Sequence, residues 1–159
     1  MNRQLLALAA VSLLTLAAPS DLRSQDTAYW TKADLAAYAK SLAPKINEQH
    51  FALERLGEFG SHFALMVHRE GNGPAEIHDE FTDFYVVQAG AGTLYTGGEV
   101  VEPKTTAPGE IRGKSIKGGQ TRPLKPGDVV NIPPKTPHQV TIESGKTITY
   151  LIVKIRAKP

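Results

Sequence analysis

Cysteine is absent from all 159 residues of the chain. Its absence excludes disulfide bonds, thiol catalysis, thiolate metal ligands and a lipid-modified cysteine anchor. The excess of charge is also small, with a formal net charge of +2, so no nucleic-acid partner is expected. No sequence period repeats, and no segment has low complexity. Any metal site must therefore be built from the five histidines and sixteen acidic residues.

The one long apolar run is too short to span a bilayer comfortably. Arg3 precedes Leu5–Ala18, a stretch of apolar and small residues with a few hydroxyls. This pattern predicts a signal peptide over residues 1–24, cleaved after Ser20 or after Ser24. The alternative is an uncleaved membrane anchor. We expect an exported protein, periplasmic or secreted, that has no stable membrane insertion after cleavage.

Residues 25–46 are expected to form an N-terminal helical segment. Thr31 and Asp34 have the spacing of a capping box, in which the hydroxyl and the carboxylate each accept a backbone N–H. Trp30, just before this box, can staple the helix onto the rest of the fold. The apolar residues that follow recur at helical spacing and form one stripe: Leu35, Tyr38, Ala39 and Leu42.

Residues 47–159 change to the pattern of short strands. Residues 61–69 alternate between two faces, one carrying His62, Ala64, Met66 and His68 and the other Phe63, Leu65 and Val67. If the first face looks inward, His68 can approach a site at His78; the alternative is a surface or hydrogen-bonded histidine. Residues 84–96 have the signature of a hairpin, and residues 147–155 that of a long β-branched strand. The fold class is therefore all-β, a single antiparallel barrel or jelly roll with a short N-terminal helix.

Residues 99–123 form a connection longer than is usual for a barrel. The stretch contains glycine, proline and five basic residues, and only residues 110–116 resemble a strand within it. Such an insert is expected to be a lid, an interface element or a mobile loop. Its acidic residues lie among the basic ones, so a solvated surface is the alternative to an anion-binding role.

Two stretches carry the candidate chemistry. His78 and Glu80 are two residues apart, so on a strand both side chains point to one face, and Asp83 and Tyr85 follow in a second alternation. Residues 127–138 read as a strand, a proline-fixed turn and then His138. If the fold brings them together, the metal ligands are His78, Glu80, Asp83 and His138. The alternative is structural: Asp83 braces a turn, Glu80 pairs with a lysine and His138 bonds to the backbone.

These two stretches resemble the paired motifs of the cupins. The first cupin motif reads Gly, five residues, His-x-His, three or four residues, Glu, six residues, Gly; residues 83–90 keep the last gap, with Asp83 for the glutamate and Glu80 for the second histidine. The second motif reads Gly, five residues, Pro-x-Gly, two residues, His, three residues, Asn. Residues 127–138 keep that spacing, with Lys135 for the glycine. The resemblance covers residues 50–158.

The resemblance implies a barrel that holds a divalent transition metal at the matching positions, namely iron, manganese, zinc or nickel. Cupins include dioxygenases, isomerases, decarboxylases and binding proteins without catalysis, and they are often homodimers. Beyond the ligands, the candidates for acid–base work are Tyr85, His68 and an unligated Glu80. Two hypotheses follow: an exported metal-dependent enzyme, dioxygenase-like or isomerase-like, that acts on a small organic molecule, or a metal-free cupin that binds a small molecule or has a structural role.

Overall fold

The computed structural model describes residues 27–157 and consists mainly of antiparallel strands. The predicted antiparallel barrel with an N-terminal helix is thereby confirmed. The signal peptide predicted over residues 1–24 lies outside the described residues. Within residues 27–157, no helix has the length and apolar character needed to cross a membrane.

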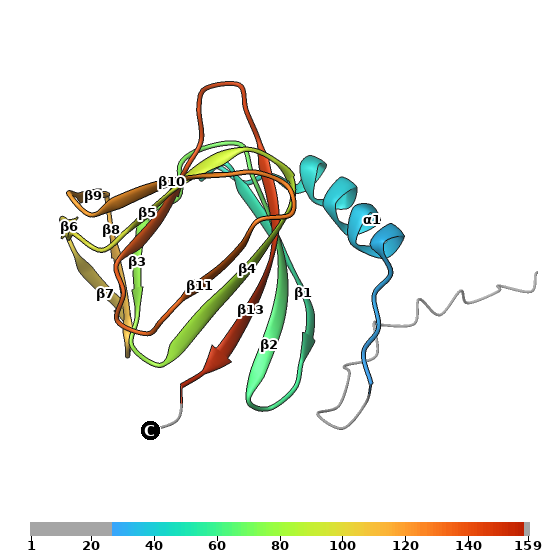
Figure 1. Cartoon of the computed structure of the whole chain (residues 1–159), viewed down its shortest axis with the longest axis horizontal. Coiled ribbons are helices and arrows are strands. Elements are labelled where there is room, and N and C mark those ends of the chain that lie inside the picture. The colour runs from blue at the N-terminus through green and yellow to red at the C-terminus, as the bar shows by residue number, and fades with distance from the viewer. Residues whose placement is uncertain (1–26, 158–159) are drawn as a thin grey trace, which may run out of the picture.

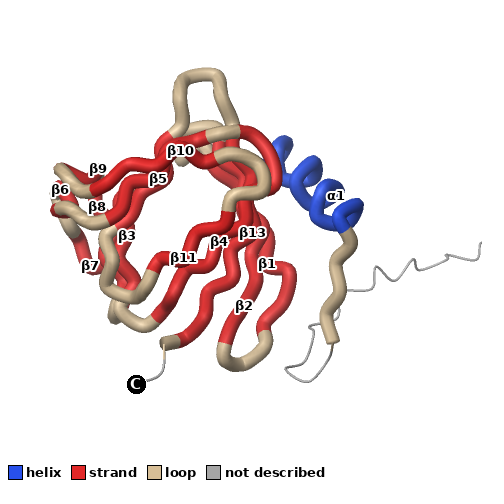
Figure 2. Tube along the Cα trace, viewed as in Figure 1, coloured by secondary structure: helices blue, strands red, loops and turns tan. Residues whose placement is uncertain are grey.

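Two sheets face each other and form the wall of the barrel (Figures 1 and 2). The first has the strand order β1-β2-β13-β4-β11. Its strands are β1 (Phe51–Glu58), β2 (His62–Arg69), β13 (Ile148–Arg156), β4 (Phe81–Gly90) and β11 (Val129–Ile132).

The second sheet has the order β10-β5-β12-β3-β8-β7. Its strands are β10 (Gln120–Leu124), β5 (Gly92–Thr96), β12 (His138–Thr141), β3 (Ala75–His78), β8 (Glu110–Gly113) and β7 (Lys104–Ala107). A separate two-stranded ladder pairs β6 (Glu99–Val101) with β9 (Ser115–Lys117).

The barrel interior is packed with side chains that alternate along each strand. Leu65 and Val67 of β2, Tyr85 of β4, and Tyr150 and Ile152 of β13 belong to one buried cluster. Their cross-strand partners agree with this, since β13 pairs Tyr150 with Val67 and Ile152 with Tyr85. Burying each such apolar side chain contributes about 1.5–3 kcal/mol, so this interior is a main source of stability.

The helix α1 (Lys32–Leu42) covers the outer face of the first sheet, beside β1 and β2 (Figure 1). The predicted capping box between Thr31 and Asp34 is present, and a single 3-10 turn, η1 (Ala43–Lys45), follows the helix. Leu42 is fully buried against Ala64 and Met66. Trp30 packs edge-on against Phe59 with ring centroids 6.3 Å apart, in agreement with its predicted stapling role.

This arrangement settles one open alternative, on the face of β2, and corrects one expectation, on residues 99–123. The β2 face that carries Ala64, Met66 and His68 looks outward beneath the helix, because the larger apolar face with Phe63, Leu65 and Val67 fills the barrel. Residues 99–123 are not a lid or a mobile loop. They form β6 to β10, and three of these strands are hydrogen-bonded into the second sheet.

Candidate metal centre

Four side chains from three strands converge at one end of the barrel core. Glu76 and His78 come from β3, Asp83 from β4 and His138 from β12, and one donor atom of each lies within 4.8 Å of the others. His78, Asp83 and His138 are only 2%, 1% and 2% exposed. The convergence follows from the pairing of the strands, since β12 places His138 directly opposite Glu76.

The two imidazoles are held with the same nitrogen facing inward. Nδ1 of His78 donates to Oε2 of Glu110 at 2.8 Å, and Nδ1 of His138 donates to the carbonyl oxygen of Thr136 at 2.9 Å. The Nε2 atoms of both rings are buried and have no hydrogen-bond partner among the described residues. Second-sphere bonds of this kind fix the tautomer and aim the free nitrogen, as in metal-binding histidines.

The two carboxylates lie around the same centre. From Nε2 of His78, Oε2 of Glu76 and Oδ2 of Asp83 are each 3.5 Å away, and the distances from Nε2 of His138 are 3.7 and 3.6 Å. These separations exceed a good hydrogen bond. The nitrogens and oxygens thus surround a common point without bonding to each other.

Cations behind the carboxylates hold them in place. Nζ of Lys154 lies 2.5 Å from Oδ1 of Asp83. Nε of Arg112 lies 3.4 Å from Oε1 of Glu76, and its Nη1 lies 3.0 Å from Oε2 of Glu110. The sheet register explains this shell, because β8 places Arg112 opposite Glu76 and Glu110 opposite His78.

The electrostatics of the cluster favour the charged forms of its imidazoles and carboxylates. Burial lowers the pKa of His78, but the neighbouring Asp83 and Glu76 carboxylates more than offset this and raise the pKa to about 9. Burial raises the pKa of Asp83, yet the two histidines and Lys154 hold it well below the usual range. The histidines and Arg112 do the same to the pKa of Glu76. A divalent cation would replace the protons on the two imidazoles and meet two carboxylates that are already ionised.

A cavity of about 590 Å³ adjoins the cluster. It is lined by Glu76 of the cluster and by Glu110 and Arg112, which contact cluster residues. The other walls are largely apolar and come from β1, β2, β4 and β13, with Phe51, Phe63, Leu65, Val67, Phe81 and Ile152 among them. A smaller inner void of about 10 Å³ reaches His138 and Tyr85. A cavity of this size and lining suits a small organic molecule.

No family model and no curated protein sequence matches this chain. Solved structures do match it. A cupin-2 domain protein from Rhodospirillum rubrum aligns with a TM-score of 0.51 and 16% identity, over 70% of this chain and 64% of that one. A putative mannose-6-phosphate isomerase from Ralstonia eutropha aligns with a TM-score of 0.50 and 15% identity, over 70% and 90%. The fold is that of a cupin.

The structure of a DMSP lyase from Ruegeria pomeroyi also matches the cupin barrel. It is 22% identical, with a TM-score of 0.48, over 67% of this chain and 47% of the lyase chain. The present chain therefore spans about half the length of that lyase. Identities this low establish the shared fold, and the chemistry of this chain rests on its own side chains.

The structure corrects one predicted ligand. Glu80 lies in the turn between β3 and β4, where its side chain is 66% exposed and pairs with Nη1 of Arg156 at 3.1 Å. Glu76 occupies the place that the sequence analysis assigned to Glu80. His78, Asp83 and His138 do converge as expected.

The missed residue has a signal in the cupin motif itself. With Glu76 in place of the first histidine and His78 as the second, the gap to Asp83 is four residues, as the motif requires. The alignment that began at His78 needed a gap of two. The correct register also puts Glu76 and His78 on the inward face of β3 and leaves Glu80 beyond the strand end.

The second cupin motif is kept in geometry although its glycine is missing. Lys135 replaces that glycine and adopts a left-handed backbone conformation with φ of 62°. Its amide donates to the carbonyl oxygen of His78 at 2.8 Å. The turn that precedes His138 is therefore tied directly to the end of β3.

The remaining candidates for acid–base work, Tyr85 and His68, lie at different distances from the cluster. The Tyr85 hydroxyl donates to Oδ2 of Asp83 at 3.3 Å, and burial together with Asp83 raises the pKa of this phenol well above its usual value. Tyr85 is thus suited to donate a hydrogen bond and not to act as a base at neutral pH. His68 faces outward, where its Nδ1 and the hydroxyl of Thr149 are 2.7 Å apart.

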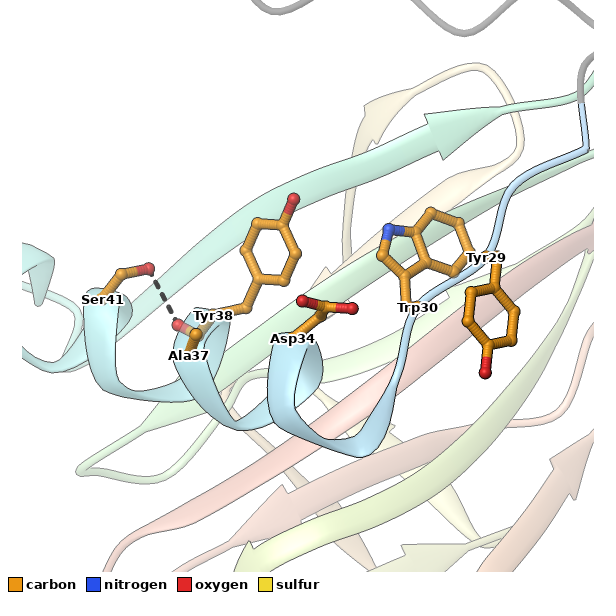
Figure 3. Close-up of a pocket in the computed structure, with 6 residues that line it drawn as sticks. All are labelled: Tyr29, Trp30, Asp34, Ala37, Tyr38 and Ser41. Carbon is orange, nitrogen blue, oxygen red and sulfur yellow. Dashed lines mark hydrogen bonds between the residues drawn. The ribbon is translucent and has the colours of Figure 1, made fainter.

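A second depression lies beside α1 (Figure 3). Tyr29, Trp30 and Tyr38 line it with Asp34, whose carboxylate already accepts the backbone N–H and the hydroxyl of Thr31 in the capping box. Ser41 donates to the carbonyl oxygen of Tyr38. Among the described residues that line this depression there is no histidine, so the imidazole donors of the barrel cluster have no counterpart there.

Proposed function

We propose that this cupin is a metal-dependent protein that acts on a small organic molecule. Glu76, His78, Asp83 and His138 would hold one divalent ion of iron, manganese, zinc or nickel, since such ions accept imidazole and carboxylate ligands. The observation that carries the proposal is the pair of buried Nε2 atoms that have no hydrogen-bond partner in the described part of the chain and are aimed at two ionised carboxylates.

The protein residues have distinct parts in this proposal. Two carboxylates balance the charge of a divalent ion, while Arg112 and Lys154 fix their orientation from behind. Tyr85 holds its proton on the phenol oxygen beside Asp83. When bound, such a metal supplies Lewis acidity that polarises an oxygen of a neighbouring molecule. The apolar walls of the cavity exclude water from that molecule.

The test is the metal content of the untagged mature chain after incubation with iron, manganese, nickel or zinc salts. We expect about one equivalent per chain, lost in His78→Ala and in His138→Ala because each removes a ligand. His62→Gln is the matched control, since His62 stacks on Phe59 away from the cluster. A folded protein that takes up no metal would favour the alternative, a metal-free binding cupin.

We also propose that the chain is exported, on the strength of the predicted signal peptide at residues 1–24. The mass of the protein recovered from its native host tests this, with new N-termini expected after Ser20 or Ser24. A full-length mass and a cell fraction that retains the protein inside would contradict export.

The homodimer that the cupin resemblance suggests stays a prediction, to be tested by the solution mass.

A further inference from the structure

One buried cation in the cavity wall forms no ion pair with any residue that the structure describes. Four basic side chains line the 590 Å³ cavity: Arg55, Arg69, Arg112 and Lys154. Arg55 pairs with Glu58, Arg112 with Glu76 and Glu110, and Lys154 with Asp83. Among residues 27–157, no carboxylate forms an ion pair with Arg69.

Arg69 is nevertheless buried and held in place. Arg69 is 8% exposed, and its Nε donates to the hydroxyl of Tyr150 at 2.9 Å. Its Nη1 is buried and has no hydrogen-bond partner among the described residues. A buried guanidinium with N–H donors that lack acceptors among the described residues is costly, so its retention points to a ligand that completes it.

The surroundings of Arg69 fix the plane of its guanidinium. The Cζ atom lies 5.0 Å from the centre of the Phe51 ring, which stands directly across from it on β1. On another side the backbone of Gly73 comes so close that an added Cβ would lie 3.0 Å from Cζ. The group is thereby positioned before any ligand arrives, which favours binding by lowering the entropy cost.

Arg69 also lies where a ligand in the cavity would meet the metal centre. Arg69, Pro74 and Glu76 line both the outer cavity and the inner void, and the inner void reaches His138. A molecule held by Arg69 at one end would therefore have its other atoms beside the cluster or against the apolar walls.

We propose that Arg69 binds the carboxylate of the substrate, so that the substrate class is a small organic carboxylate with an apolar body. A guanidinium offers parallel N–H donors that match two carboxylate oxygens. The phenyl and aliphatic side chains of the cavity, such as Phe63, Phe81 and Ile152, would contact the apolar part. This inference deepens the proposed function and rests on the same cavity, but carboxylate binding by Arg69 does not require the metal.

The experiment is calorimetric titration of the mature chain, both zinc-loaded and metal-stripped, with benzoate, phenylacetate and 4-methylpentanoate. The primary amide of each acid is its neutral counterpart. We expect at least one carboxylate to bind at least about tenfold more tightly than its amide, and Arg69→Met to weaken it by about tenfold or more. Arg55→Met, at the half-exposed rim of the same cavity, is the matched control and should change the affinity less than about twofold.

A second variant covers the case in which Arg69→Met fails to fold. Gly73→Ala keeps Arg69, but the added Cβ would displace the Arg69 guanidinium. Carboxylate affinity should therefore fall, while the circular dichroism spectrum stays unchanged. Equal binding of every carboxylate and its amide, or unchanged affinity in both variants, overturns the inference. Absence of binding by all three carboxylates at about 10 mM also overturns it.

The same titrations separate the two proposals. If none of iron, manganese, nickel and zinc binds but a carboxylate still binds through Arg69, the metal-dependent function is wrong and the carboxylate site stands. If zinc binds with one equivalent and Arg69→Met has no effect on any carboxylate, the function stands and the substrate class is wrong.

Discussion

Metal-induced stabilisation should distinguish Glu76 from Glu80 as a ligand. The perturbation is a pair of single substitutions, Glu76→Gln and Glu80→Gln, which remove the same charge from positions four residues apart. The Glu76 carboxylate lies 3.5 Å from Nε2 of His78, whereas Glu80 pairs with Arg156 on the surface. Only the first substitution should reduce metal affinity.

The magnitude follows from linkage. A metal that binds only the folded chain adds about 2.7 kcal/mol at a free concentration of one hundred times Kd. For a domain of this size, that corresponds to a rise in Tm of about 8 °C. If the loss of one charged ligand weakens binding about a hundredfold, the same concentration adds only about 0.4 kcal/mol, or about 1 °C.

The assay is thermal unfolding followed by circular dichroism, with and without zinc, for the wild type and both variants. We expect the zinc-induced shift to survive in Glu80→Gln and to shrink to about 1 °C in Glu76→Gln. The reasoning is refuted if the shift disappears in Glu80→Gln and persists in Glu76→Gln. Equal shifts in all three proteins would place the zinc elsewhere.

Three further predictions concern stability. The His78 pKa is raised from 6.5 to about 9 in the folded state. Its contribution is therefore full below pH 6.5 and lost as pH rises toward 9, so the urea midpoint of the metal-free protein should fall over that interval; a rising midpoint would contradict this assignment. Lys135→Gly should raise the free energy of unfolding by about 0.5–1 kcal/mol, because the residue has φ of 62°, and a lower urea midpoint would count against the strain. Leu42→Ala should cost about 2–5 kcal/mol, since Leu42 is fully buried between helix and sheet, and a loss under about 1 kcal/mol in urea unfolding would show that the helix is poorly docked.

Local signals in the sequence predicted the elements that depend on near neighbours. The helix start at Thr31 and Asp34 needs only four residues to form, and the barrel follows from alternation and turn residues along the strands. His78, Asp83 and His138 were found because a motif with fixed gaps records where strands end. Glu76 was missed because the motif was aligned two residues late.

The expectations that failed depend on long-range pairing. Alternation shows that β2 has two faces but not which one looks inward, and that choice is made by β13 and the helix, which placed His68 outside. Residues 99–123 resemble a loop because their strands are short and glycines occur in the turns between them. Their structure comes from pairing with strands that are distant in sequence. β8 pairs with β3, and β10 pairs with β5.

The candidate metal ligands belong to both sheets, so the order of folding decides when they can assemble. Asp83 lies on the first sheet, whereas Glu76, His78 and His138 lie on the second. No half of the barrel contains the full set, so the ligands cannot assemble until the two sheets have closed on each other. Contacts between residues as distant in sequence as Glu76 and His138 form slowly. Metal uptake would then be a late event in maturation, and the ions present in the compartment where the barrel closes are those that this chain can acquire.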